Sequence, residues 1–60
     1  MSVYYVWDHS RRAFFREGPT PHWTTEPCHA TAFAFMTTAT LTAYGLGLDN
    51  FDVVTGPVCA

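Results

Sequence analysis

Between Cys28 and Leu48 the chain runs for 21 residues without an Asp, Glu, Lys or Arg. In a chain of 60 residues, such a block must cross a membrane, form a buried helix or present an uncharged surface to a partner. A membrane-spanning helix needs about 20 mainly apolar residues. The block has this length, but five Thr, one His and two Gly dilute it, and neither flank is basic. We therefore expect no membrane span, but a core helix with a Thr-rich outer face.

The length of the chain limits what it can stabilise. We expect one domain, residues 1–60, which buries only about 60% of its unfolded surface and is marginally stable. Apolar residues make up 48% of the sequence and aromatic residues 17%, which argues against disorder. The aromatic side chains bury large areas and can replace the metal or disulfides on which small folds often depend.

Charge and cysteine content narrow the class of protein further. A net charge of −2, with three Arg and no Lys, argues against a phosphate-binding surface. Two cysteines, Cys28 and Cys59, are too few for a disulfide framework. One disulfide between them is an alternative, but we expect two reduced thiols in a cytosolic protein. Residues 1–7 lack a basic region followed by an apolar one, so we expect no secretory signal.

Three segments have the composition of β-strands. Val3–Trp7 contains only β-branched and aromatic residues, and Ala13–Arg16 follows it after a turn-like segment. Phe51–Thr55 is the third, and Gly56-Pro57 ends it. Residues 17–21 contain one Gly and two Pro and are predicted to form a loop.

A helical spacing of three and four residues links Met36, Ala39, Thr40, Ala43 and Leu46. It predicts a helix from about Met36 to Leu46 that packs through Met36, Ala39 and Ala43. We also predict a short helix over residues 26–32, because Glu and Pro are favoured in a first helical turn.

The ends of the main helix have their own signals. Thr37 or Thr38 is the expected N-cap, and Gly45 or Gly47 the expected stop.

The order of these elements, β-β-α-β, predicts an α+β domain. We expect a three-stranded antiparallel sheet in the order 2-1-3, with the main helix on one face. Along the first strand, Val3, Tyr5 and Trp7 point one way, while Tyr4 and Val6 point the other. Some aromatic side chains should therefore lie on the uncovered face. Either a loop over residues 17–23 covers them, or they form a binding patch.

Residue types suited to chemistry occur, but not in suitable patterns. His22, Cys28, His29 and Cys59 could bind zinc, but no C-x₂-C or H-x₃-H pair is present. Cys28 near a helix start would favour a thiolate, yet 60 residues leave little room for a substrate pocket and an oxyanion site. We expect no metal, no cofactor and no catalytic residue.

The charged residues suggest partner binding instead. Asp49 and Asp52 flank the start of the third predicted strand, so that end is expected to be acidic, with Glu17 and Glu26 joining it across the fold. An acidic edge can dock onto a basic groove of a protein that handles nucleic acid, or it can serve solubility alone. The predicted partner-binding residues are Tyr4, Phe14, Glu17, Glu26, Asp49 and Asp52.

A basic cluster of Arg11, Arg12 and Arg16 lies near the predicted hairpin. Because acidic residues flank it, we interpret it as a solvated face and expect no direct nucleic-acid binding. The alternative is a small nucleic-acid-binding regulator that also stacks bases on exposed aromatic residues.

The second half of the chain and the hairpin before it resemble a known class of small proteins. The positions on which the resemblance rests are Trp23-Thr24, Pro27, Ala30, Phe33, Ala39, Ala43, Gly45-Leu46-Gly47-Leu48, Phe51 and Val53-Val54. With the aromatic hairpin ahead of them, they resemble tiny proteins encoded by bacteriophages and prophages. In size and character the chain is most similar to type I anti-CRISPR proteins. The resemblance implies a non-enzymatic inhibitor that binds a Cascade-like complex in the bacterial cytoplasm and blocks its action on DNA. It transfers no functional residue by motif.

Another phage role remains open: a structural component that self-assembles, as a homodimer or larger, through its uncharged Thr face.

Overall fold

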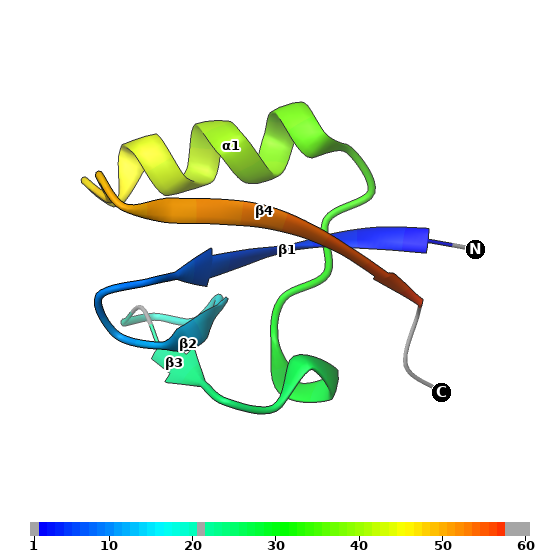
Figure 1. Cartoon of the computed structure of the whole chain (residues 1–60), viewed down its shortest axis with the longest axis horizontal. Helices are drawn as coiled ribbons and strands as arrows, with labels where there is room; N and C mark the ends of the chain where they lie inside the picture. Colours follow the sequence, from blue (N-terminus) through cyan, green and yellow to red (C-terminus); the bar gives the residue numbers. More distant parts are fainter. Residues whose placement is uncertain (1, 21, 58–60) are drawn as a thin grey trace.

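In chain order the elements are β1 (Ser2–Asp8), β2 (Ala13–Arg16), β3 (His22–Thr24), the 3₁₀ helix η1 (Pro27–His29), α1 (Met36–Gly45) and β4 (Phe51–Pro57). The computed structural model describes residues 2–20 and 22–57. The four strands form one antiparallel sheet in the order β3-β2-β1-β4, and α1 runs alongside β4 and β1 (Figure 1).

The α+β class and the antiparallel sheet confirm the prediction, as does the central position of β1 between β2 and β4. The predicted strand number was wrong, because β3 adds a fourth strand beside β2. Trp23 pairs with Phe15, and Thr24 pairs with Phe14. Three residues are too few for alternation to distinguish a strand from a loop. Only the pairing with β2 makes β3 a strand.

The longest pairing in the sheet joins β1 to β4. It runs without interruption from Ser2↔Pro57 to Asp8↔Phe51. Alternation along β1 divides the sheet into two sides. The helix side carries Val6 and faces α1, and the far side carries Tyr5, which lies near η1.

The segment before α1 is hydrogen-bonded to β1 and to the end of β2. Phe33 exchanges two backbone hydrogen bonds with Tyr4, each 2.8 Å long. The Thr31 N–H donates to the Phe15 carbonyl at 3.1 Å, and the Thr31 hydroxyl accepts from the Glu17 N–H at 2.6 Å. Phe33 therefore pairs with the same edge of β1 as β2 does, at the part of β1 that β2 does not reach.

Two alanines bring α1 onto the sheet. Ala39 and Ala43 are fully buried, and they pack in one cluster with Val6, Phe15 and Leu48. Around this cluster lie larger, partly buried side chains: Tyr4, Trp23, Phe33, Leu46, Phe51 and Val53.

Met36, predicted as a third packing position, is instead 53% exposed. It is the first residue of the helix, and the chain reaches it from an extended Phe35 (φ −128°, ψ 140°). The predicted N-caps, Thr37 and Thr38, were also wrong: the N-cap is Phe35, which makes no side-chain capping bond. Apolar Phe35 carries no capping signal in the sequence.

The end of α1 confirms the expected glycine stop. Gly47 has a φ of +76°, and its N–H donates to the Tyr44 carbonyl at 3.0 Å. The Leu48 N–H donates to the Ala43 carbonyl at 3.1 Å. This pair of bonds is a Schellman motif, which turns the chain and places Leu48 in the core.

The short helix predicted over residues 26–32 forms only as the three-residue η1. Cys28 in η1 is disulfide-bonded, so the expectation of a reduced thiol there was wrong. The sequence has one other cysteine, Cys59, which lies outside the described residues. Spacing alone could not have distinguished one bridge from two thiols.

A buried carboxylate closes the turn between β1 and β2. Asp8 is 2% exposed, and its two oxygens accept hydrogen bonds from the Ser10 N–H at 3.0 Å and from the Arg11 guanidinium at 2.5 Å. The Arg11 guanidinium also lies 4.4 Å from the centre of the Trp23 ring. Burial raises the pKa of Asp8, but the hydrogen bonds from Arg11 and Ser10 outweigh it and hold the pKa below its usual value.

Asp8→Asn should lower the free energy of unfolding at pH 7 by about 1–3 kcal/mol, as for hydrogen bonds to charged groups. Because the folded-state pKa is lowered, the stability from Asp8 is present above the unfolded pKa of about 3.9 and is lost as pH falls through the folded value. Urea unfolding at pH 7, 5 and 3 should show a steeper acid loss in the parent than in Asp8→Asn. Asp49→Asn, which changes an exposed carboxylate, should follow the parent; equal slopes in all three would contradict this role.

Ala43→Asp should place an unpaired charge against the sheet and lower the free energy of unfolding by several kcal/mol, about 3 or more. Leu41→Asp on the opposite side of α1 is the matched control, and it should change stability by less than about 1 kcal/mol. Thermal unfolding of both variants measures this. The assigned helix face is wrong if Ala43→Asp melts with the parent.

Cys28→Ser should lower the free energy of unfolding by about 2–4 kcal/mol, as removal of a disulfide from a small domain does. Parent protein treated with a reductant should melt at the temperature of the variant. Titration of the unfolded, unreduced parent with a thiol reagent should find no thiol at Cys28, and a reactive thiol there would contradict the bridge.

Candidate functional site

The largest exposed apolar side chains of the described residues all come from α1 and its N-cap. They are Phe35, Met36, Leu41 and Tyr44, which are 68%, 53%, 70% and 65% exposed. We call these four residues the α1 outer face. Leu41 lies about opposite the buried Ala39 and Ala43 at the helical repeat of 100° per residue. Leu41 and, on its flank, Tyr44 thus lie away from the two alanines, whereas Phe35 and Met36 are exposed where the helix begins.

The surface around these side chains is uncharged. Helix α1 has no charged residue. The Thr40 hydroxyl donates to the Met36 carbonyl at 2.9 Å, and the Thr42 hydroxyl to the Thr38 carbonyl at 2.8 Å. Two threonines that read as polar in the sequence therefore satisfy their hydroxyls on the helix itself. The surface is less polar than its composition indicates.

Tyr44 also links the α1 outer face to the sheet. Its ring packs edge-to-face on Phe51, with 5.4 Å between the ring centroids. Phe51 begins β4, the outermost strand on that side of the sheet. The exposed helix and the edge strand therefore adjoin each other at this ring pair.

The structure does not bring the two predicted aromatic anchors together. Tyr4 lies on the helix side, partly buried against the core. Phe14 is on the far side, where it packs edge-to-face on Trp7 at 4.7 Å and on Tyr5 at 6.1 Å. One partner surface cannot contact both side chains.

The predicted acidic residues do not form one edge either. Asp49 and Asp52 are exposed near the β1–β2 turn, where Asp52 Oδ2 lies 2.6 Å from His9 Nε2. Arg12 is in the same turn, so this end of the sheet carries both signs of charge. Glu17 follows β2 and therefore lies at the other end of the sheet.

Glu26 is exposed at the start of η1, and its N–H donates to the Thr24 hydroxyl at 3.1 Å.

Of the basic cluster, Arg11 is engaged by Asp8, while Arg16 lies at the opposite end of β2. The three arginines therefore make no continuous basic stripe.

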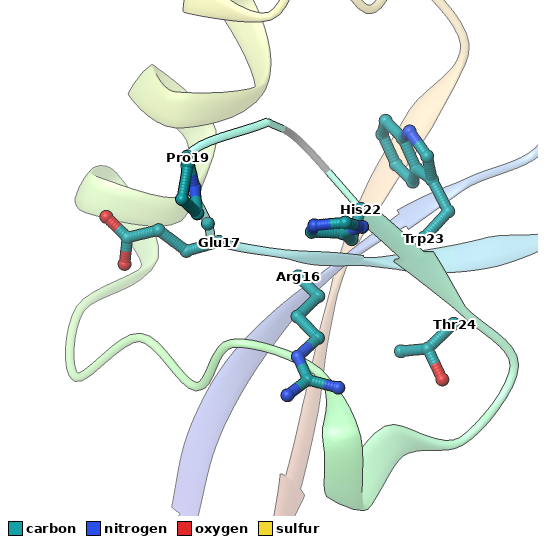
Figure 2. Close-up of a pocket in the computed structure, with 7 residues that line it drawn as sticks. Arg16, Glu17, Pro19, His22, Trp23 and Thr24 are labelled. Atoms are coloured by element: carbon teal, nitrogen blue, oxygen red, sulfur yellow. The ribbon is translucent and has the colours of Figure 1, made fainter.

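A shallow pocket of about 530 Å³ lies at the β2–β3 hairpin; its lining is Arg16, Glu17, Gly18, Pro19, His22, Trp23 and Thr24. Arg16 and His22 are register partners, and the Glu17 carboxylate points away from both (Figure 2). The pocket offers a guanidinium and an imidazole to an anionic group, but no nucleophile paired with a base. Among its described lining residues, these two basic side chains are suited to binding such a group.

A second cavity, of about 370 Å³, lies on the far side between η1 and β4. Its lining is mainly apolar and includes Tyr5, Phe14, Pro27 and Val54. Like the first pocket, it lies away from the α1 outer face.

Among residues 2–20 and 22–57, no group of three or more His, Cys, Asp and Glu side chains is placed to hold a metal ion. Of the four zinc-type residues, Cys59 lies outside this range, and Cys28 is engaged in a disulfide. Within the same range, no helix has the length and apolar content to cross a membrane.

No protein-family model matches the sequence, and no curated protein or solved structure matches it significantly. The residues and their geometry therefore carry the functional argument alone.

Sequence reasoning missed the α1 outer face, although the uncharged block contains it. The signal was present: Leu41 and Tyr44 are three residues apart and lie outside the Ala39/Ala43 stripe. The predicted packing positions Ala39 and Ala43 are the buried ones, but the opposite side was described only as Thr-rich, and the large apolar side chains on it were not considered.

Proposed function

We propose that this protein acts without catalysis, by binding a partner protein through the α1 outer face. One observation carries the proposal: the exposed large apolar side chains of the described residues all belong to one uncharged helix and its N-cap, at Phe35, Met36, Leu41 and Tyr44. Scattered exposed apolar residues are normal, but a cluster on one element is typical of an interaction surface.

The geometry favours a helix-in-groove mode of binding. An exposed helix can lay anchors three and four residues apart into an apolar groove. Leu41 and Tyr44 have this spacing, and aromatic anchors such as Tyr44 often dominate binding energy. The absence of charge on α1 means that little charge must be desolvated when the groove closes over it.

Two exposed carboxylates near α1 contribute less to binding than the apolar side chains do. Exposed Asp49 and Asp52 lie near the C-terminal end of α1, beyond the Gly47 turn. Rim charges of this kind influence association rate more than affinity. A groove with a basic rim, as in proteins that handle nucleic acid, suits this arrangement.

In its most specific form, the proposal is that the partner is a type I Cascade-like complex, which a phage-encoded chain inhibits in the bacterial cytoplasm. The resemblance to small anti-CRISPR proteins supports this form. The disulfide at Cys28 argues against a cytoplasmic site of action, because disulfides are rare in a reducing cytoplasm. An inhibitor that acts there must keep its activity after reduction.

A nucleic-acid-binding regulator is the alternative from another class. Arg16 and His22 at the β2–β3 pocket would hold a phosphate. However, Arg11 is occupied by Asp8, and the basic groups are separated. An electrophoretic shift of DNA or RNA that weakens steeply with salt would favour this alternative.

Tyr44→Ala should weaken partner binding by about 2 kcal/mol, or roughly 30-fold, and Leu41→Asp should weaken it further, because each alters the buried centre of the contact. The first measurement is the affinity of purified type I Cascade for the parent and both variants. If that complex does not bind the parent, the partner class is wrong, and the same variants are tested on whatever a bacterial lysate yields.

The matched control is the double variant Asp49→Asn with Asp52→Asn. It should keep affinity within about 1 kcal/mol and mainly slow association at low salt. If Leu41→Asp binds as the parent does while its fold is intact, the α1 outer face is not the binding surface.

A further inference from the structure

We propose that β4 is a pairing edge for a second copy of this chain, and that two molecules join their β4 strands antiparallel about a two-fold axis at Val54. The result would be a continuous eight-stranded sheet, twice the four-stranded sheet of one molecule. The proposal rests on the backbone of β4, and not on the proposed function of α1.

The position and length of β4 make it suited to pair with a further strand. It has one strand neighbour, β1, in the described part of the chain, and its other edge is unpaired by any strand. It is seven residues long, as is β1, whereas β3 at the opposite edge has only three. The long edge strand is therefore the one able to accept a further strand.

Every second residue of β4 points its backbone groups outward, away from β1. In an antiparallel ladder, bonded and non-bonded pairs alternate. Tyr4 bonds through both its N–H and its carbonyl to Phe33, on the side away from β4, so Tyr4↔Thr55 is a non-bonded pair. By alternation, Phe51, Val53 and Thr55 direct their N–H and carbonyl groups away from β1. Three donors and three acceptors are thus presented in a row.

The middle of β4 lacks the usual protections of an edge strand. Natural edges are blocked by Lys, by inward charges, by bulges or by Pro in the strand. The β1–β4 register has no bulge, and Pro57 stands only at the end. The one charged residue, Asp52, is held by His9 at the opposite end.

A second copy of this chain fits the edge of β4 as its pairing partner. Val54 is the midpoint of β4, so a two-fold axis there pairs the full strand with itself. Val54 then faces Val54 of the second copy, Val53 faces Thr55, and Asp52 faces Gly56. No like charges stand opposite each other, although each chain has a net charge of −2.

Packing adds to the backbone bonds. Val53 on the helix side and Val54 on the far side are both only partly buried in one molecule. A second β4 would cover both. Because an edge contact buries less than the roughly 800 Å² per partner of a standard interface, we expect a dimer that dissociates on dilution.

The two-fold axis stands perpendicular to the sheet, so both α1 helices lie on the same side of the joined sheet. The dimer would thus present α1 twice on that side. A partner with two grooves would then bind with higher avidity than one molecule allows.

Amide hydrogen exchange by NMR, across a concentration series of the full chain, tests the pairing residue by residue. The N–H groups of Val53 and Thr55 should gain at least tenfold protection as concentration rises. Those of Asp52 and Val54, which face β1, are the internal control and should not change with it. Sedimentation should show, over the same series, a shift toward twice the 6.7 kDa chain mass.

Thr55→Lys puts a charge on an exposed edge position and should raise the dimer dissociation constant at least tenfold. Thr25→Lys, at an exposed site beyond β3, is the matched control and should dimerise as the parent does. Leu41→Asp should also dimerise normally, so loss of the α1 contact and loss of the dimer are separate results.

A chain that stays monomeric at millimolar concentration, with Val53 and Thr55 unprotected, overturns the proposal. So does protection of these two amides that appears only when another protein is added, since β4 would then pair with that protein instead. If Thr55→Lys fails to fold, the exchange pattern of the parent still decides.

Discussion

The close contact of Ala39 and Ala43 with the sheet determines how this small protein is built. Both alanines are fully buried against Val6 and Phe15, so the axis of α1 can approach β1 and β4 closely. A helix that packs through methyl groups contributes little apolar area of its own, at about 25 cal/mol per Å² buried. The aromatic side chains around the contact, among them Phe15 and Trp23, must supply most of the burial. The same arrangement directs Leu41 and Tyr44 outward, because no space remains for them under the helix.

The turn between β1 and β2 is held by a second, polar interaction, the hydrogen bonds to the Asp8 carboxylate. Asp8 is buried at the end of β1, and it accepts hydrogen bonds from Ser10 and Arg11 in the turn that follows. Arg11 in turn stacks on Trp23 of β3, so one buried carboxylate connects the turn to the far edge of the sheet. Removing either charged partner would leave the other less satisfied, and the cost is greater for the buried carboxylate than for the half-exposed Arg11. The fold of a chain this short thus rests on both apolar packing and one fixed charge.

Sequence reasoning found the elements whose signals are local and missed those set by packing. Val3–Trp7 could be predicted as a strand from composition, and Gly47 as a helix stop from its freedom at positive φ. The strand at His22–Thr24 could not, because three residues acquire their character only by pairing with Phe14 and Phe15. The helical spacing correctly predicted Ala39 and Ala43 as packing positions and failed only at Met36, which stands at the first residue of the helix. It did not show that Leu41 and Tyr44 would lie exposed on the other side. The bridge at Cys28 depends on chain path, which spacing does not contain.

The distribution of charge connects the α1 outer face with the β4 edge. Asp8, Arg11, Arg12, Asp49 and Asp52 lie around one end of the sheet, while Arg16 and Glu17 lie at the other end of β2. Between these ends, α1 and the middle of β4 carry no charge, and they adjoin each other at the Tyr44–Phe51 ring pair. Neither surface is required to be uncharged for the stability of one molecule, since exposed charges on a helix or an edge strand cost little and favour solubility. Of the eight charged residues in the sequence, only Asp52 belongs to either of these two adjoining elements, which is the charge distribution expected of interfaces rather than of solvent-facing elements.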